Sequence, residues 1–247
     1  METDILLFAA IGFLAQLVDG ALGMAFGVIC SSSLLAFGLP PALASASIHA
    51  AEVVTTGISG VSHLYHRNVD KSLFLKLVVT GVLGGIVGAY ILTGLPETSV
   101  KVFVSVYLVG MTLLIFNRVL GRVHRGIKPS AQLLGAGGGF LDAIGGGGWG
   151  PLVVSSLVAT GGDPRRSIGS ANLAEFFVTV AISVTFLFHL NFAEYGDIVL
   201  GLVIGGAVAA PLAGYLICIM PQKLALALVG MAVSSQAILS IYNLLSA

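Results

Sequence analysis

The chain has 247 residues, of which 57% are hydrophobic and only 9% are charged, and its formal net charge is zero. Soluble domains carry about 25% charged residues, so this composition cannot cover a water-facing surface and indicates an integral membrane protein. Because basic residues are few, nucleic acid is excluded as a partner. The two cysteines, Cys30 and Cys218, lie far apart in apolar runs and predict neither a disulfide framework nor a zinc site.

Two of the first four residues, Glu2 and Asp4, are acidic, and none is basic. A secretory signal peptide begins with a positively charged region instead. We therefore expect the first apolar segment to belong to the mature fold.

The sequence contains two internal copies. Residues 19–56 align without a gap on residues 142–179, and 13 of the 38 aligned positions are identical. The shared positions include Asp19/Asp142, Gly23/Gly146, Gly27/Gly150, Ser32/Ser155, Ser33/Ser156, Pro41/Pro164, Ser47/Ser170, Glu52/Glu175 and Thr56/Thr179. Such similarity at a fixed offset indicates a tandem duplication, with one repeat at residues 1–122 and the other at 123–247.

Each half begins with two short apolar segments separated by a glycine-containing break, and continues with three longer segments. The short pairs occupy residues 5–37 and 131–160, and the longer segments are 41–65, 73–95 and 100–119, then 164–189, 195–220 and 222–245. A helix needs about 20 residues to cross the hydrocarbon core, so three segments in each half can span the membrane and the short ones cannot.

The break in the second half is the run from Asp142 to Pro151, with four successive glycines from Gly145. Each glycine costs a helix about 1 kcal/mol relative to alanine, and proline favours the first helical turn. We expect a helix to end before Gly145 and another to begin near Pro151.

Loop charges decide how the short pairs lie. Basic residues gather at three places, which the positive-inside rule assigns to the cytoplasm: Arg67, Lys71 and Lys76; Arg118, Arg122, Arg125 and Lys128; and Arg165 and Arg166. If each short pair is a hairpin that enters and leaves on the same side, all three clusters face the cytoplasm. If each pair crosses once, Arg165 and Arg166 face outside.

The hairpin interpretation fixes the predicted fold class, an all-α polytopic membrane protein. Each half has an odd number of spans, so the two halves form inverted-topology repeats, each with a re-entrant helical hairpin and three transmembrane helices. Both termini are predicted outside, and both hairpin tips near the membrane midplane.

Broken helices in inverted repeats mark transporter sites, and helix starts favour anions. The predicted substrate-binding residues lie at the two tips and on the adjoining helices: Gly23, Phe26, Gly27, Ser32, Ser33, Gly146, Gly147, Gly148, Trp149, Gly150, Ser155, Ser156 and Asn172. Helix packing for the glycines and aromatic residues, and bonding of the serines to their own helix, remain open alternatives.

Charged residues inside membrane spans are costly, which makes Asp19, Asp142, Glu52 and Glu175 functional candidates. They either carry protons for coupled transport or bond to hairpin backbone N–H groups and hold the breaks in shape. His49 lies on the same helix face as Glu52, as does His63, and either histidine could relay protons.

Two other functions remain open. One is a passive anion channel. The other is an intramembrane serine protease, because Gly57 to Gly60 match the G-x-S-G pattern around Ser59, with His189 as a conceivable base. The sequence has no Walker motif for ATP, and we expect neither catalysis nor a cofactor.

The run Asp142 to Pro151, with its degenerate copy Asp19 to Gly27, resembles the signature of the sulfite exporter TauE/SafE family. The resemblance implies a transporter of sulfite, a sulfonate such as sulfoacetate, or a related anion, in a bacterial inner membrane. Leu22, Met24 and Ala25 replace glycines of the second copy. The anion, the direction, the coupling ion (a proton or another) and the oligomeric state, a homodimer included, stay open.

Overall fold

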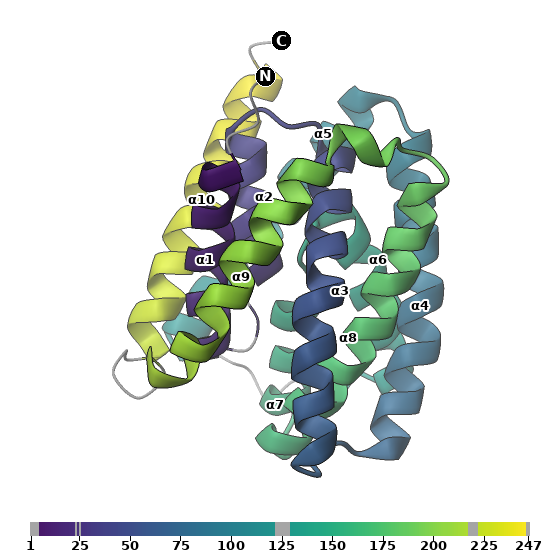
Figure 1. The fold of residues 1–247 in the computed structure, drawn as a ribbon, viewed down its shortest axis with the longest axis vertical. Helices are drawn as coiled ribbons and strands as arrows, with labels where there is room; N and C mark the ends of the chain where they lie inside the picture. The colour runs from purple at the N-terminus through teal and green to yellow at the C-terminus, as the bar shows by residue number, and fades with distance from the viewer. Residues whose placement is uncertain (1–4, 23, 25, 122–128, 217–221, 246–247) are drawn as a thin grey trace.

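The computed structural model describes residues 5–22, 24, 26–121, 129–216 and 222–245, which form helices and connecting turns without a strand (Figure 1). The all-helical class predicted from the sequence is confirmed. The helices are α1 (Ile5–Leu22), α2 (Phe26–Ala36), α3 (Pro41–Tyr65), α4 (Lys71–Gly94), α5 (Glu97–Val119), α6 (Ala131–Gly145), the π-helical turn η1 (Gly150–Val154), α7 (Ser155–Ala159), α8 (Pro164–Leu187), the 3-10 turn η2 (Phe192–Glu194), α9 (Gly196–Leu216) and α10 (Gln222–Leu245).

Two antiparallel helix pairs open the two halves of the chain. The first consists of α1 and α2, and the second of α6 with η1 and α7 (Figure 1). The second break begins at Gly146, a left-handed residue with φ of 69° that caps α6, and continues through Gly147 with φ of 148°. Only glycine adopts such a succession without strain. We refer to the residues from Asp19 to Gly27 as the first tip and to those from Asp142 to Gly150 as the second tip.

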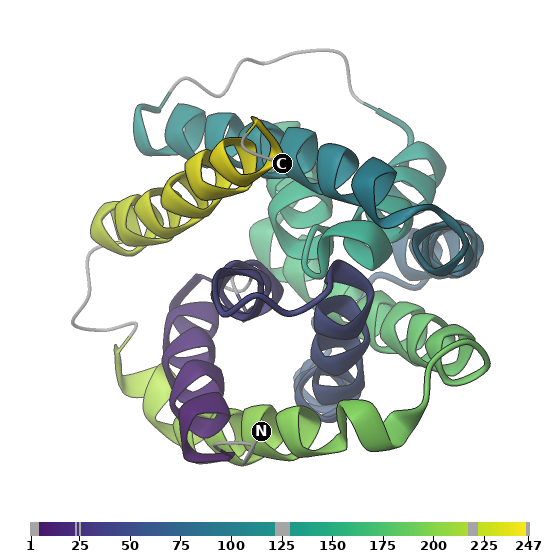
Figure 2. The ribbon, with the colours of Figure 1, turned by 90° about the horizontal axis from the view of Figure 1, so that it is seen from above.

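The two halves exchange helices in their packing. Helix α1 packs along α9, and α6 packs along α4, while α3 packs on α8 and α5 on α10 (Figure 2). In the first two pairs the helices run in the same direction. Gly84 and Gly88 of α4 lie in order against Ala136 and Phe140 of α6, and Gly201 and Gly205 of α9 lie in order against Ile5 and Ala9 of α1. The internal alignment pairs α1 with α6 and α4 with α9. Each of these two pairs therefore contains one helix from the first half and one from the second.

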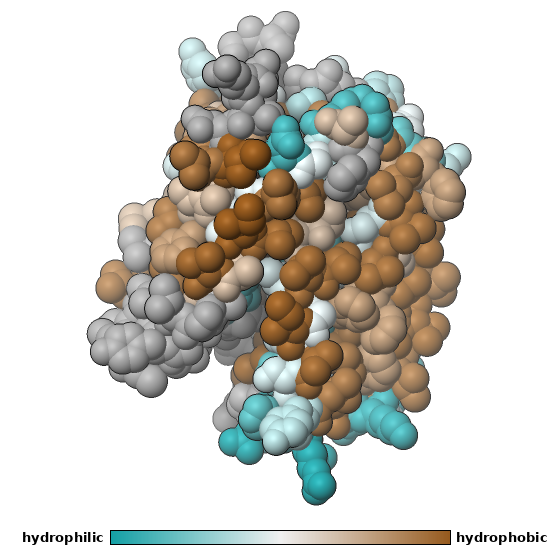
Figure 3. All heavy atoms as spheres, in the orientation of Figure 1, coloured by the Kyte–Doolittle hydropathy of each residue, from teal (hydrophilic) through white to brown (hydrophobic). Residues whose placement is uncertain are grey.

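The outer surface is apolar over its middle. Figure 3 shows hydrophobic residues across the central part of the visible face and hydrophilic residues gathered toward the two ends. By length and composition, three helical segments of the described chain could cross a membrane: Lys71–Gly94, Thr98–Asn117 and Arg165–Leu187. For the other three long segments, the six-span arrangement stays a prediction.

The loop after α3 and the start of α8 lie at the same end of the molecule, at the bottom of Figure 1. The N–H of Asp70 donates to the Ser170 hydroxyl over 2.8 Å and so joins the two segments. Asp70 also caps α4 through the N–H of Leu73, as Asp163 caps α8 through that of Arg166. The basic clusters at residues 67–76 and 165–166, about 100 residues apart in the sequence, therefore lie at the same end of the molecule.

Candidate functional site

The two tips meet inside the molecule. A Cβ atom on Gly27 would lie 2.5 Å from the Cα of Gly147, and one on Gly150 would lie 2.7 Å from the Cα of Met24. The hydroxyl of Ser31 donates to the carbonyl of Gly145 over 2.6 Å. Because real Cβ atoms cannot approach so closely, the backbones of the two halves touch only where glycine permits it.

A small cavity lies at this contact. Its volume is about 20 Å³, and both halves line it, with Asp19, Met24, Phe26, Gly27 and Glu52 from the first and Gly147, Gly150, Pro151 and Glu175 from the second. A cavity needs about 10–15 Å³ to hold a water molecule, so this one holds about one water. An anion of several heavy atoms requires the two tips to move apart.

Asp19 and Asp142 hold the tips in shape. Oδ1 of Asp142 accepts from the N–H groups of Gly148 over 2.7 Å and of Trp149 over 2.9 Å. Oδ1 of Asp19 accepts from the N–H of Phe26 over 3.1 Å at the start of α2. A carboxylate on backbone N–H groups at a helix start is a charge-assisted cap. The structural role proposed for both acids is therefore present in the geometry.

Asp142 has a second partner on another helix. Its Oδ2 lies 3.2 Å from Nε2 of His49 on α3, and both side chains are buried, at 1% and 0% exposure. Nδ1 of His49 lies 2.7 Å from the carbonyl of Ser45, and the Ser45 hydroxyl donates to the carbonyl of Ala143 over 2.5 Å. These bonds tie the middle of α3 to the end of α6.

Glu52 and Glu175 occupy equivalent positions on α3 and α8 and both line the cavity. Glu52 is 4% exposed, and its Oε2 has no hydrogen-bond partner among the described residues. A buried carboxylate oxygen without a partner is costly unless a proton or a ligand satisfies it. Glu52 therefore offers a buried oxygen that a proton or a ligand can satisfy.

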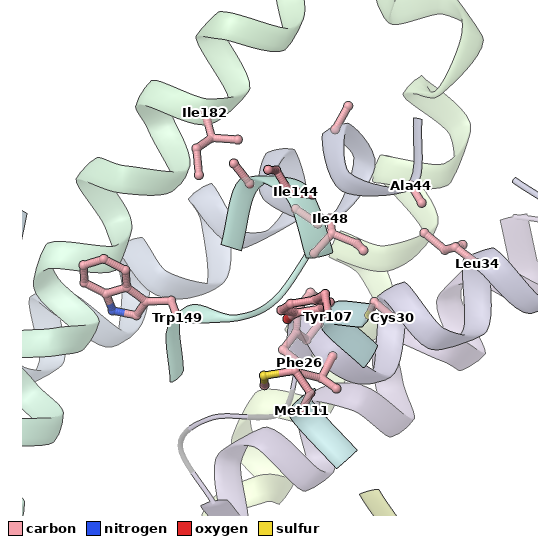
Figure 4. Close-up of a cluster of buried hydrophobic side chains, with 14 of the residues drawn as sticks. Phe26, Cys30, Leu34, Ala44, Ile48, Tyr107, Met111, Ile144, Trp149 and Ile182 are labelled. Atoms are coloured by element: carbon pink, nitrogen blue, oxygen red, sulfur yellow. The ribbon is translucent and has the colours of Figure 1, made fainter. Parts of the chain in front are cut away.

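Trp149 points away from the cavity. Its indole Nε1–H donates to the carbonyl of Ala171 on α8 over 3.1 Å, and its ring lies against Gly81 of α4. In Figure 4 it lies apart from Phe26 and Tyr107, which are on the other side of the second tip. The structure therefore gives Phe26, but not Trp149, a place at the cavity wall.

The remaining predicted tip residues have mixed positions. Gly146 turns the chain, its N–H bonded to the Asp142 carbonyl, and Gly148 gives its N–H to the Asp142 side chain. Gly23 lies outside the described residues. The hydroxyl of Ser32 is buried and unpaired within the described chain, while that of Ser33 donates to its own helix at Ile29.

The predicted residues of the second half that follow the tip lie off the cavity lining. The Ser155 hydroxyl donates to Sδ of Met24 over 3.5 Å, and the carbonyl of Ser156 accepts from Thr160. The Asn172 amide donates to the Ser59 hydroxyl over 3.2 Å and lies 3.4 Å from Nε2 of His63. Asn172 therefore joins α8 to α3.

Sequence reasoning missed Tyr107 on α5. Its ring packs against Gly145 and its hydroxyl lies beside Gly148, so it supports the second tip from behind. That hydroxyl is buried without a partner among the described residues. No pattern could have identified it, because the aligned position of the other half is Gly230.

The serine protease alternative gains no geometric support. Ser59 accepts from Asn172, whereas Nδ1 of His189 is bonded to the Thr185 carbonyl and its ring packs on Tyr90. Acyl transfer requires a base within hydrogen-bond reach of the nucleophile. The described contacts do not place His189 there.

The apolar surface, the broken helices and the buried polar centre together define a helical membrane protein of the transporter class. The family model for the sulfite exporter TauE/SafE matches residues 8–238. The chain is also 42% identical over 227 residues to the probable membrane transporter protein YtnM of Bacillus subtilis strain 168, covering 86% of this chain and 74% of that protein. The protein therefore belongs to the TauE/SafE family of membrane transporters. No solved structure matches it.

Proposed function

We propose that this protein is a secondary transporter of a small anion, sulfite or an organosulfonate of the sulfoacetate type, with its binding site between the two tips. The observation that carries the proposal is that two helix starts, at Phe26 and Gly150, meet at one buried polar cavity lined by both halves. Helix starts present N–H groups and a positive dipole end to an anion. The family model's description as a sulfite exporter supports this choice of substrate class.

We further propose that the two helix pairs are re-entrant hairpins that enter the membrane from opposite sides. Three observations support this topology: each pair is antiparallel, α1 and α6 pack on equivalent helices of the opposite half, and two basic clusters share one end of the molecule. A broken helix is tolerated at membrane depth where protein buries it or where it borders a cavity. In this topology the protein spans a bacterial inner membrane, and both of its termini lie on the outer side.

The closed contact between the tips requires a movement of the two halves during transport. The cavity admits about one water, so the anion enters only when one half moves relative to the other, which is alternating access. The two tips can separate at this point without disrupting side-chain packing, since Gly27 and Gly147 meet through their backbones. Four carboxylates near the cavity also require that an incoming anion be accompanied by positive charge.

The test is a binding screen of the purified protein against sulfite, thiosulfate, sulfoacetate, taurine and simple carboxylates. A true ligand at 100 times its Kd stabilises the fold by about 2.7 kcal/mol, which a thermal-shift assay detects. Gly150→Val should abolish the shift, because its Cβ would lie 2.7 Å from the Met24 backbone. Gly137→Val is the matched control, since an added Cβ there has no neighbour within 4 Å.

Uptake into proteoliposomes completes the test. We expect counterflow against the anion gradient for the wild type and Gly137→Val, and none for Gly150→Val. Full uptake by Gly150→Val would contradict a site between the tips. Uptake that never runs uphill would indicate a passive channel instead.

A further inference from the structure

Three ionisable side chains from α3 and α6 converge beside the cavity. One nitrogen of His49 and one carboxylate oxygen each of Glu52 and Asp142 all lie within 4.8 Å of one another, and all three residues are buried. Glu52 also lines the cavity, whereas His49 and Asp142 do not. The cluster therefore reaches from the end of α6 to the place where the two tips meet.

The hydrogen bonds of His49 show where the cluster can hold a proton. A carbonyl oxygen only accepts, so the 2.7 Å contact to the Ser45 carbonyl places one proton on Nδ1. Nε2 and Oδ2 of Asp142 lie 3.2 Å apart, close enough to share one further proton. Until that proton binds, two lone pairs face each other in a buried site.

Two further acids lie near the cluster. Glu175 of α8 and Asp19 of α1 line the same cavity as Glu52, while Asp142 of α6 is within 4.8 Å of Glu52. Tyr107 of α5 lies against Gly145 and Gly148 of the second tip, and Cys30 of α2 is buried. His49 is a base that the structure pairs directly with one of these acids, Asp142.

Asp142 connects the proton to the second tip. One oxygen of its carboxylate holds the N–H groups of Gly148 and Trp149, and the other faces His49. A proton that moves onto or off this pair changes the charge of the group that caps the tip. Glu52, whose Oε2 is buried and unpaired within the described chain, stands between this pair and the cavity.

We infer that His49, Glu52 and Asp142 form a proton-binding site that takes up one proton from solution with each anion bound at the tips. The inference rests on the proposed anion transport. The proton offsets the charge of the anion among the four carboxylates and leaves with it on the other side. The second half lacks the same site, because Asn172 replaces His49 and bonds to Ser59.

The test measures proton uptake directly. Purified protein is titrated with thiosulfate or sulfoacetate, neither of which titrates near neutral pH, by calorimetry in sodium-free buffers of different ionisation enthalpy. The wild type should take up about one proton per anion, and its Kd should rise tenfold for each pH unit above neutrality. His49→Asn, which copies the second half, should show no uptake and a flat pH profile.

His66→Asn is the matched control at the C-cap of the same helix, since the His66 side chain is exposed and its Nδ1 bonds to the Ser62 carbonyl. It should keep the uptake of the wild type. Glu52→Gln, which keeps the shape of the side chain, serves as a second variant and should also flatten the pH profile. If neither variant folds, the wild-type titration alone decides.

Each outcome has a distinct meaning. Anion binding whose heat is independent of the buffer and whose Kd is independent of pH overturns the proton site but leaves the transporter. Binding that requires Na⁺ overturns it in favour of a metal cation at the same three residues. No heat from any anion of the screen overturns the proposed function itself.

Discussion

The two tips share a design and differ in what they can do. In both, an aspartate caps the N–H groups that follow the break, through Phe26 in the first tip and through Gly148 and Trp149 in the second. Only the second tip is built from successive glycines, and there the chain passes through positive φ twice. The first tip places Met24 where the second has Gly147.

The helices that follow the tips differ in the same sense. His49 on α3 reaches across to Asp142 of the opposite half, while its equivalent on α8, Asn172, bonds to Ser59. The duplication thus gives two repeats with similar backbones, and a substitution such as His49 for asparagine gives the two repeats different roles. We interpret the second tip as the more specialised half of the anion site, and the first half as the source of the base that serves it.

The largest effect is expected from exchanging the side chains at Met24 and Gly147. Gly147→Met should abolish anion binding, because residue 147 has a φ of 148° and its α-carbon lies against Gly27. Met24→Gly should leave a folded protein that still binds, more weakly than the wild type, since it removes a side chain from the cavity wall and its contact with Ser155 but adds no atoms between the tips. Anion-dependent thermal shifts of the two variants provide the measurement. Equal losses in both would show that the tips contribute alike.

A smaller effect separates the two roles of Asp142. Asp142→Ala leaves the buried N–H groups of Gly148 and Trp149 without their acceptor, which should lower the free energy of unfolding by about 2–6 kcal/mol. Asp142→Asn keeps an oxygen for these groups and removes the charge that faces His49. We expect a melting temperature near that of the wild type for Asn, with a flat pH profile of anion binding.

The control for this pair is Asp163→Asn at the exposed cap of α8, where the side chain bonds to Arg166. It should change neither stability nor pH dependence appreciably. If Asp142→Ala were as stable as Asp142→Asn, the capping bonds would contribute little and the aspartate would be retained for the proton alone.

The sequence predicts the helical membrane class, the duplication and the family, because composition, apolar length and repeated residues are local signals. It also selects several residues that border the cavity, among them Gly27, Glu52, Gly147 and Glu175. Inward-facing acids and glycines in matching positions are conspicuous in an apolar chain.

Other parts of the site could not be predicted because they depend on packing between distant segments. The contact of His49 with Asp142 joins residues 93 positions apart in opposite halves, and the internal alignment shows only that histidine replaces asparagine. Likewise, Tyr107 supports the second tip from α5 without a counterpart in the other half. The sequence also does not show which way the aligned aromatic residues Phe26 and Trp149 point, because aligned positions can have different side-chain directions.

The smallest expected effect tests that direction at the equivalent positions Phe26 and Trp149. The indole of Trp149 is fully buried against Gly81 and bonded to the carbonyl of Ala171, whereas Phe26 lines the cavity. Trp149→Phe should lower the free energy of unfolding by about 1–2 kcal/mol, because the Ala171 carbonyl loses its donor and the ring leaves a small void. The Kd for the anion should stay within about twofold of the wild type, because this side chain contacts α4 and α8 rather than the cavity.

Phe26→Leu is the matching change in the first tip, and it should raise the Kd several-fold at similar stability, because the wall itself changes shape. Melting temperatures and Kd values of both variants decide the matter. A tenfold weaker Kd in Trp149→Phe with unchanged stability would place the indole at the anion in another state of the cycle.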